Sequence, residues 1–511
     1  MVDMTYLIGI DIGTSATKII IMNENGKIFA SVSKNYKLIK PKNGWAEQDP
    51  EDWKNAVLEG LTEALRNAAL KKEDIKGIGL TGQMHGIVML DEEGVPLRKS
   101  IIWCDQRSDE QVRQMLKIMP EEEWLRITGN PPIAAWSAAK ILWIKQYEPE
   151  IYQRCKHILL PKDYIRYVLT GEFATDVSDA SGTQLLNVAA RKWSKEVLDK
   201  LEIDRTLLPN VYESQEVTGN ITAPIGKLIG LSADTVVVAG ASDNAGAAIG
   251  MGAVEEDIAF VTLGTSAIIY THLNEYRAIP EGSLHICCSA VKGCWHTMGG
   301  PQAAGLSLQW FIENFCHAYM DEAEKEKKGV FDVINHEVTN VPIGSNRLIY
   351  MPYLMGERTP HMNPDCRGVF FGLNVVHTKA NLLRAVMEGV GYSMADCSEI
   401  LKQVGIHIKA IRACGGGSKS KVWKQIIADI LNCDLVTMNQ EEGPAFGAAI
   451  LAGVGVGIYK DVKMACQNLL VEKQYVHSIK ENNQVYQSYH QLYTGLYIDT
   501  KKHFTELALL K

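Results

Sequence analysis

The chain has 511 residues, of which 46% are hydrophobic and 22% are charged. This length exceeds what one hydrophobic core usually serves, so two domains are expected. The formal net charge of -8 at pH 7 gives no electrostatic reason to expect nucleic acid as a partner, because proteins that bind the phosphate backbone normally have a clustered basic surface. Chemistry on a small molecule is the better expectation.

Cysteine usage and the opening residues predict where the protein resides. The eleven cysteines include no Cys-x-x-Cys pair, which argues against a disulfide framework and favours a reducing compartment. The start, MVDMTYLIGIDIG, lacks a basic region followed by a long apolar run and a cleavage site. No stretch approaches membrane-spanning length without charges. We therefore expect a cytoplasmic protein with no membrane partner.

The first elements in chain order are three extended runs. Residues 9–21, GIDIGTSATKIII, form two β-rich runs around a polar break, and KIFASVSKNYKL follows the turn signal NENG. This order excludes Rossmann and Walker loops, whose glycines open a helix. The break is either a plain tight turn or an anion grip, in which backbone N–H groups hold phosphate beside a metal ion at Asp11.

A helix and a strand are expected next. Asp49 is a candidate N-cap with Pro50 at the first helical position, and Trp53, Val57, Leu61 and Leu65 recur every four residues on one face. Residues 75–83, IKGIGLTGQ, read as a strand.

Residues 262–270, TLGTSAIIY, repeat the Gly-Thr-Ser-Ala of residues 13–16 between two β-rich runs. Two such turns suggest duplicated lobes that grip one phosphate chain from both sides, with the boundary near residues 250–256. Further on, helices are expected over 301–315 and 379–404, a buried strand over 347–354, and a solvated charge run over 321–328.

Several polar groups at strand ends are candidates for chemistry. Asp243 follows an apolar strand in a Gly- and Ala-rich stretch that would leave room for a ligand, and it is either a helix N-cap or a general base. His85, after Gln83 and Met84, is either a turn histidine bonded to backbone or a ligand contact. WCDQR, residues 103–107, offers groups that polyhydroxy compounds need. The glycines at 415–417 are either a flexible connection or a surface for a ring or phosphate.

The chain resembles the carbohydrate kinases of the FGGY family, in the actin-like ATPase superfamily, and among them the xylulokinases most closely. The resemblance covers nearly the whole chain and rests on long motifs in the same order: GIDIGTSATK, GWAEQDPEDW, GLTGQMHG, IIWCDQRSDEQ, LLPKDYIRYVLTGEFATDVSDASGT, DNAGAAIG, LGTSA, YMPYLMGERTPHMNPDCRGVFFGL, CGGGSKSKVWKQIIADIL and EGPAFGAAILA.

This resemblance implies an α/β fold of two ribonuclease-H-like domains around a catalytic cleft. Residues 1–250 would be the sugar-binding domain, and residues 251–511 the nucleotide-binding domain with a helical tail. The implied reaction is transfer of a phosphoryl group from ATP to D-xylulose with Mg²⁺, and Asp243 is the implied general base. The other implied site residues are Asp11 for magnesium, Gln83, Met84, His85 and Asn244 for the sugar, and Thr14, Lys18, Gly264, Thr265, Gly305, Gln309, Gly416, Gly417 and Ser420 for ATP.

Two stretches depart from the family pattern. Ala134, Ala135 and Trp136 precede Lys140 where xylulokinases tend to have a different set, and Ser242 stands where glycine is common. The first departure leaves open a kinase for another sugar or polyol, such as ribulose, gluconate or a deoxy ketose. Outside sugar kinases, the alternatives are an actin-like chaperone or filament ATPase and a non-catalytic sugar sensor. The resemblance also suggests a homodimer.

Overall fold

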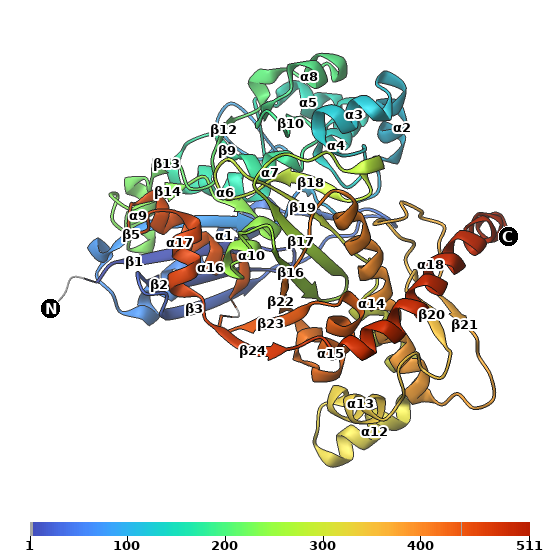
Figure 1. Ribbon diagram of the computed structural model, residues 1–511. Helices are drawn as coiled ribbons and strands as arrows, with labels where there is room; N and C mark the ends of the chain where they lie inside the picture. Colours follow the sequence, from blue (N-terminus) through green and yellow to red (C-terminus); the bar gives the residue numbers. More distant parts are fainter. Residues whose placement is uncertain (1–3, 441, 511) are drawn as a thin grey trace.

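The computed structural model describes residues 4–440 and 442–510 and contains two seven-stranded mixed sheets with helices around them (Figure 1). The first sheet has the order β13-β14-β5-β1-β2-β3, with β15 beside β5. Its strands are β1 (Tyr6–Ile12), β2 (Ala16–Asn23), β3 (Ile28–Asn35), β5 (Ile75–Gly82), β13 (Val217–Asn220), β14 (Val236–Val238) and β15 (Ala241–Ser242).

The second sheet has the order β18-β19-β17-β16-β22-β23-β24. Its strands are β16 (Ile258–Leu263), β17 (Ala267–Leu273), β18 (His285–Cys288), β19 (Trp295–Gly299), β22 (Ala410–Cys414), β23 (Asp434–Met438) and β24 (Glu472–Val476). Both sheets contain an antiparallel meander, β1-β2-β3 or β16-β17-β19, with a parallel strand, β5 or β22, next to its first strand. The predicted fold class and the two hairpins are therefore confirmed.

Helix α1 (Pro50–Ala68) covers one face of the first sheet and follows from its sequence. Asp49 caps it by accepting a hydrogen bond from the Glu51 N–H at 3.1 Å, and Pro50 fits the first helical position because it has no N–H to satisfy. Trp53, Val57 and Leu61 are fully buried, and the helix packs on β2 and β3. Burying each such side chain contributes roughly 1.5–3 kcal/mol.

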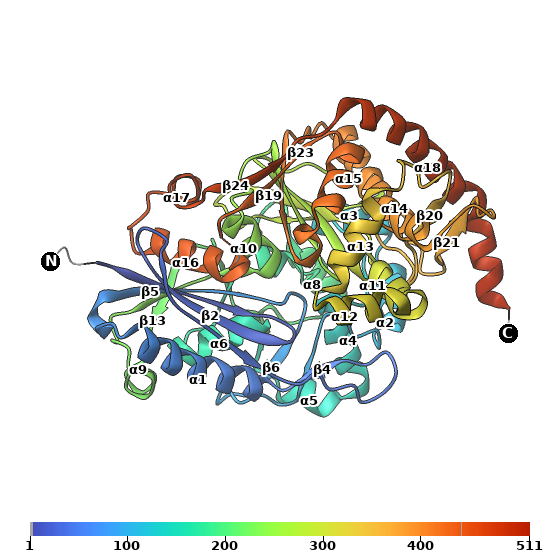
Figure 2. The same cartoon turned by 90° about the horizontal axis from the view of Figure 1, so that it is seen from below.

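Two helices rich in small residues, α10 (Asp243–Gly250) and α16 (Gly443–Gly455), lie between the sheets (Figure 2). Helix α16 packs on β1, β5 and α10, and α10 in turn faces Phe260 and Tyr270 of the second sheet. A Cβ on Gly447 would lie 2.0 Å from the carbonyl oxygen of Gly246, so only glycine permits this approach. Because α16 comes late in the chain yet covers the first sheet, the domain ranges 1–250 and 251–511 stay a prediction.

The remaining elements surround this framework. Helices α2, α3, α4 and α8 pack around a second core that contains Trp124 and Ile144. The bounds are α2 (Asp109–Ile118), α3 (Glu121–Thr128), α4 (Ser137–Tyr147), α5 (Pro149–Arg154), α6 (Pro161–Thr170), α7 (Val177–Ser181), α8 (Lys195–Leu201) and α9 (Ala223–Ile229), with short strands β4 (Glu47–Gln48), β6 (Val88–Leu90), β7 (Ser100–Ile101), β8 (His157–Leu159), β9 (Ala174–Asp176), β10 (Leu186–Asn187), β11 (Lys192–Trp193) and β12 (Asn210–Tyr212).

The second half adds α11 (Gly305–Phe315), α12 (His317–Glu326), α13 (Val330–Thr339), β20 (Ile349–Met351), β21 (Val369–Phe371), α14 (Lys379–Gln403), α15 (Lys421–Leu431), α17 (Val462–Leu469) and α18 (Lys480–Leu509). Helix α14 matches its predicted range, α11 begins four residues later than predicted, and the charge run at 321–328 lies on an exposed surface.

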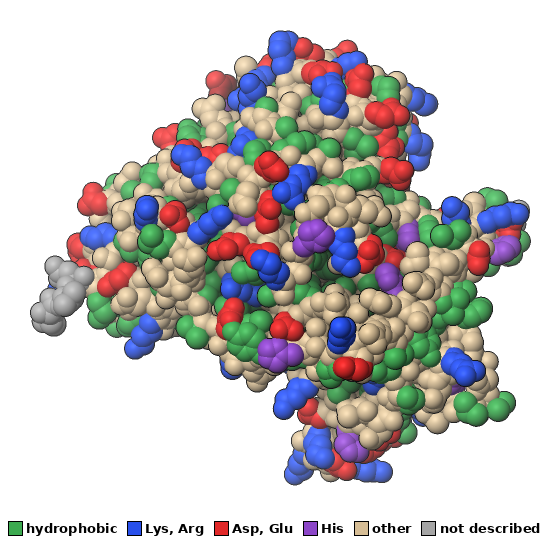
Figure 3. Space-filling model, in the orientation of Figure 1, with side chains coloured by type: hydrophobic (Ala, Val, Ile, Leu, Met, Phe, Trp, Pro, Cys, Tyr) green, Lys and Arg blue, Asp and Glu red, His purple; other side chains and the backbone are tan. Residues whose placement is uncertain are grey.

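Acidic and basic side chains are interspersed over the face in Figure 3. No helix in the described part of the chain combines the length and apolar character needed to cross a membrane.

Candidate active site

The two halves of the chain together line a cavity of about 620 Å³. The first half contributes Met84, His85, Trp103, Cys104, Gln106, Ala135, Trp136, Asp243 and Asn244. The second half contributes the β16–β17 turn with the start of β17 (265–268), His285, residues 298–302, Leu306, Met355, Arg358 and Thr359. A cavity of this size with a few convergent polar groups is the usual setting for a small-molecule ligand.

Asp243 is positioned by β15 and the start of α10. Ser242 caps the helix, because its Oγ accepts a hydrogen bond from the Ala245 N–H at 3.4 Å; the interpretation of Asp243 as the N-cap is therefore wrong. The Asp243 carboxylate accepts hydrogen bonds from the main-chain N–H (2.7 Å) and side-chain amide (3.0 Å) of Asn244. Burial, and after it the charge of Asp11, raises the pKa of Asp243 to about 7. A carboxyl with this pKa is suited to accept a proton near neutral pH.

Asp11 lies near the end of β1. Its carboxylate accepts a hydrogen bond from Thr81 Oγ1 at 3.0 Å, and burial raises its pKa to about 6 against the opposing effects of Thr81 and Lys18. Lys18 is the cross-strand partner of Asp11 and forms an ion pair with Glu442. The charge of Asp11 contributes to the raised pKa of Asp243, so the two carboxylates lie close enough to interact. Mg²⁺ is commonly bound by one or two carboxylates together with phosphate oxygens and water, which Asp11 fits.

Each Gly-Thr-Ser turn is closed by a hydrogen bond from its glycine N–H, but the first turn spans one residue more than the second. The Gly13 N–H donates to the Ala16 carbonyl and the Gly264 N–H to the Ser266 carbonyl, both at 3.0 Å. The first turn is attached to the cavity wall through Thr14, whose Oγ1 accepts a hydrogen bond from Trp103 Nε1 at 2.9 Å.

The second turn abuts the start of α11. The Gly305 N–H donates to the Gly264 carbonyl at 2.9 Å, and a Cβ on Gly305 would lie 2.3 Å from that oxygen. Thr265 and Ser266 line the cavity. The second turn therefore forms part of the cavity wall, and the first turn is hydrogen-bonded to that wall through Trp103.

His85 both bonds to backbone and lines the cavity, so the two readings of this residue are compatible. Its Nδ1 lies 2.7 Å from the Gly182 carbonyl oxygen, and its ring stacks on Trp136 at a centroid separation of 5.0 Å. Burial, and next the charge of Lys140, lowers the pKa of His85 well below its ordinary value. Because a carbonyl only accepts, the neutral ring carries its proton on Nδ1, which leaves Nε2 as an acceptor for a ligand.

Other predicted site residues have their side chains engaged elsewhere. The Gln83 amide donates to the Gly13 carbonyl (3.3 Å) and to Gln48 (2.8 Å), which supports the first turn. Gln309 donates to Glu313 at 2.7 Å. Ser420 caps α15 through the Trp423 N–H. Gly416 and Gly417 belong to a 3₁₀ turn that follows β22.

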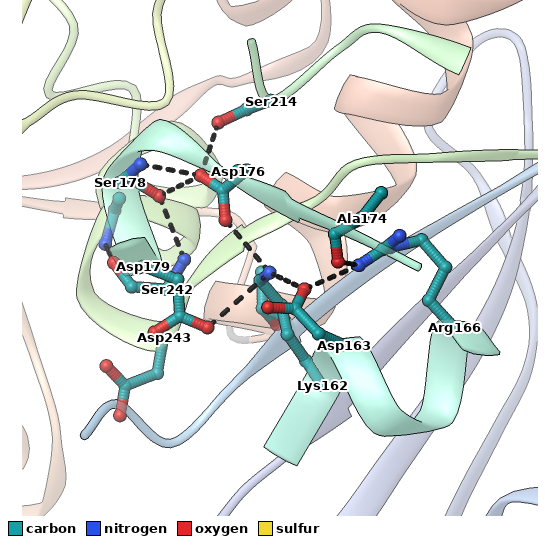
Figure 4. Close-up of polar contacts among 12 residues, drawn as sticks. Lys162, Asp163, Arg166, Ala174, Asp176, Ser178, Asp179, Ser214, Ser242 and Asp243 are labelled. Atoms are coloured by element: carbon teal, nitrogen blue, oxygen red, sulfur yellow. Dashed lines mark hydrogen bonds and ion pairs between the residues drawn. The ribbon is translucent and has the colours of Figure 1, made fainter. Parts of the chain in front are cut away.

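Behind Asp243 lies a buried charged cluster that local sequence signals did not indicate (Figure 4). Lys162 Nζ lies 2.6 Å from Asp163, 2.9 Å from Asp176 and 3.4 Å from Asp179, and all four side chains are fully buried. Burial opposes the charged form of Lys162, but the three carboxylates outweigh it, so the pKa of the lysine is raised. The motif that contains these residues was visible in the sequence, but their convergence depends on tertiary structure.

This cluster is connected to the backbone of the Asp243 segment. Ser178 Oγ donates to Asp176 at 2.5 Å and accepts from the Ser242 N–H at 3.0 Å. Because Ser242 directly precedes Asp243, this chain of hydrogen bonds holds the strand end from which Asp243 projects.

Sequence and structure comparisons agree with this geometry. Residues 6–250 match the N-terminal domain of the FGGY family of carbohydrate kinases, and residues 259–456 match its C-terminal domain. The chain belongs to the FGGY family of carbohydrate kinases. The xylulose kinase of Staphylococcus epidermidis is 38% identical over 507 residues, which cover 99% of each chain.

Two solved structures from Lactobacillus acidophilus are also similar. A ligand-bound xylulose kinase superposes with a TM-score of 0.91 at 30% identity over 98% of this chain and all of the other. A gluconate kinase superposes with the same TM-score and identity over 99% of this chain and all of the other. These comparisons establish the fold and the family. The names xylulose kinase and gluconate kinase are those of the two solved proteins.

Proposed function

We propose that this protein is a xylulokinase, which transfers the γ-phosphoryl group of ATP to a terminal hydroxyl of D-xylulose and releases xylulose 5-phosphate and ADP. The observation that carries the proposal is Asp243, a carboxyl with a pKa near neutrality on the wall of a cavity lined by both halves of the chain. The 38% identity to a xylulose kinase over nearly the full length supports the choice of substrate.

In this mechanism Asp243 accepts the proton of the attacking hydroxyl as the bond between that oxygen and the γ-phosphorus forms and the bond to the β-phosphate oxygen breaks. Asn244 orients the carboxylate through its two hydrogen bonds. Asp11 is the residue that would hold Mg²⁺, which when bound neutralises charge on the β- and γ-phosphates. Backbone N–H groups of the turns at Gly13 and Gly264 would bind the same phosphates.

The two substrates would occupy different parts of the site. Met84 and His85 bind sugar hydroxyls, with Trp136 as an apolar wall. The nucleotide is assigned mainly to the second half, at Gly264, Thr265, Gly305, Gln309, Gly416, Gly417 and Ser420, with Thr14 and Lys18 on the first hairpin. We further propose a cytoplasmic location and a homodimer.

Gluconate is the second candidate acceptor. The likeness to a gluconate kinase equals the likeness to a xylulose kinase in TM-score and identity. Arg358 lines the cavity, and its guanidinium forms no ion pair with a carboxylate of any described residue. An unpaired guanidinium would suit the carboxylate of a sugar acid.

A coupled assay of ADP release over a panel of ketoses, polyols and sugar acids tests the proposal. We expect magnesium-dependent turnover with the highest kcat/KM for D-xylulose, and loss of that turnover in Asp243→Asn. A higher kcat/KM for D-gluconate would replace the substrate and keep the kinase. ATP hydrolysis that no sugar stimulates would reject the sugar kinase.

A further inference from the structure

The segment between β20 and β21 brings one cation from the second half of the chain into the cavity. Arg358 lines the cavity together with His85 of the first half and His285 of β18. Its side chain is half-buried, and burial lowers the pKa of the guanidinium while Glu357 opposes this effect. Partial burial of a charged guanidinium costs free energy unless hydrogen bonds or an opposite charge, for example from a ligand, offset the lost hydration.

The neighbours of Arg358 leave much of its donor capacity unused. The Glu357 carboxylate accepts instead from main-chain N–H groups, that of Arg358 at 2.9 Å and that of Gln302 at 3.2 Å. With the Gln302 amide oxygen turned toward Arg358, that oxygen accepts from Nε at 3.2 Å. The two terminal nitrogens form no hydrogen bond to any residue that the structure describes.

The two histidines near Arg358 do not supply a negative charge. Burial, and next the charge of Arg358, lowers the pKa of His285 to about 4, and the pKa of His85 is also lowered. Among the described residues that line this end of the cavity, Arg358 is the cation, and the imidazoles and the Trp136 ring are neutral at neutral pH. Lys140 lies behind this wall, where its Nζ donates to the His85 carbonyl at 2.9 Å. Free N–H donors in a planar fork are suited to hydroxyl, carbonyl or carboxylate oxygens.

The segment that carries Arg358 is braced by the C-terminal helix. His361 stacks on Tyr497 of α18 at a centroid separation of 3.5 Å, and Tyr353 Oη lies 2.8 Å from Tyr493 Oη, also of α18. The Glu357 main chain pairs with that of Asn363. Contacts on both sides of Arg358 thus fix where its guanidinium enters the cavity.

We propose that Arg358 is a sugar-binding residue, which donates hydrogen bonds from its terminal nitrogens to oxygens of the acceptor sugar. The inference rests on the proposed function and adds to it a sugar contact from the second half of the chain. Because His85 comes from the first half, a sugar held by both residues links the two lobes across the cavity, and sugar binding favours their approach.

The test compares Arg358→Met and Arg358→Lys with the control Arg367→Met. Arg367 lies on the same segment, is exposed, and donates only to the Pro364 and Cys366 carbonyls in the described structure. Sugar affinity without nucleotide is read from tryptophan fluorescence, since Trp103 and Trp136 line the cavity. ADP affinity and melting temperature are measured on the same samples, with D-xylulose and D-gluconate as separate arms.

Arg358→Met should weaken sugar binding about 10- to 100-fold, the usual effect of losing hydrogen bonds from a charged donor. ADP affinity and melting temperature should stay close to those of the control. Arg358→Lys, which keeps the charge without the planar fork, should recover part of the affinity. A loss confined to D-gluconate would support the assignment and identify a carboxylate as the group bound.

Sugar affinity that equals the control in both Arg358 variants would overturn the assignment. So would a loss of ADP affinity with sugar binding intact, which would place Arg358 at the phosphates. These results differ from failure of the proposed function, in which the wild-type protein itself would phosphorylate no sugar.

Discussion

Replacing Asp243 by asparagine should abolish most activity and at the same time stabilise the ligand-free protein above neutral pH. The pKa of Asp243 rises from 3.8 in a model peptide to about 7 in the folded protein. Each pKa unit corresponds to 1.36 kcal/mol, so the ionised carboxylate costs the folded state about 4 kcal/mol. The asparagine variant does not carry this cost, while general-base catalysis worth about 10²- to 10⁴-fold is lost.

The sign of the pH dependence follows from proton linkage. Between pH 3.8 and about 7, the Asp243 carboxyl is still protonated in the folded protein but already ionised in the unfolded chain. Its contribution to the free energy of unfolding is therefore fully present below pH 3.8 and is lost as the pH rises through about 7. The melting temperature of Asp243→Asn should therefore exceed that of the wild type by a margin that grows between about pH 4 and pH 7 and then levels off.

Thermal unfolding without nucleotide or magnesium, across this pH range, measures the margin. Asp199→Asn is the matched control, because Asp199 is exposed and, in the part of the chain that the structure describes, its carboxylate forms an ion pair with Lys195 on the surface. A margin that is zero or independent of pH would refute the burial argument, and an active asparagine variant would refute the general base.

Three further predictions concern the metal, the support of the base and the lobes. Asp11→Asn should lower kcat by orders of magnitude at ordinary magnesium concentration, since an amide cannot offset the charge of Mg²⁺; near-native kcat in a magnesium titration would remove Asp11 from the mechanism. Ser178→Ala should lower kcat several-fold and shift the pH–rate profile while ATP affinity holds, because it breaks the link to Ser242; an unchanged profile would make that link purely structural. Sugar with a non-hydrolysable ATP analogue should reduce the radius of gyration in solution scattering, as expected if lobe closure excludes water, and an unchanged radius would contradict closure.

Local sequence signals predicted the elements well where neighbouring residues determine them. The Gly-Thr-Ser turns, the capped start of α1 at Asp49 and the long helix α14 all depend on short stretches of sequence, and all are present. The repeated turn also predicted the duplicated sheet plan, because both turns join the first two strands of a meander.

Tertiary packing explains what the sequence left open. The Gly- and Ala-rich stretch after Asp243 was interpreted as room for a ligand, and Asp243 and Asn244 at its start do line the cavity. Further along, Gly250 serves the close packing of α10 on α16, because a Cβ there would lie 2.0 Å from the Gly443 carbonyl oxygen. Ser242 is the N-cap of α10, because Ser242 has the extended backbone conformation that precedes a helix and Asp243 is already the first helical residue.

The cavity itself could be predicted only in part. Met84, His85, Asp243, Asn244 and Thr265 were expected at the site and do line the cavity. The contributions of His285 and Arg358 could not be read from spacing, because the second sheet and a loop braced by α18 bring them there. The buried cluster around Lys162 was hidden for the same reason.

Direct detection of the product tests the central claim most directly. Wild-type protein incubated with ATP, Mg²⁺ and D-xylulose is followed by phosphorus NMR, in which a new phosphomonoester coupled to the protons of carbon 5 should appear in equal amount with ADP. Asp243→Asn should give neither signal above background. ADP with inorganic phosphate in place of the sugar phosphate, or a phosphomonoester formed at an undiminished rate by Asp243→Asn, would contradict the account.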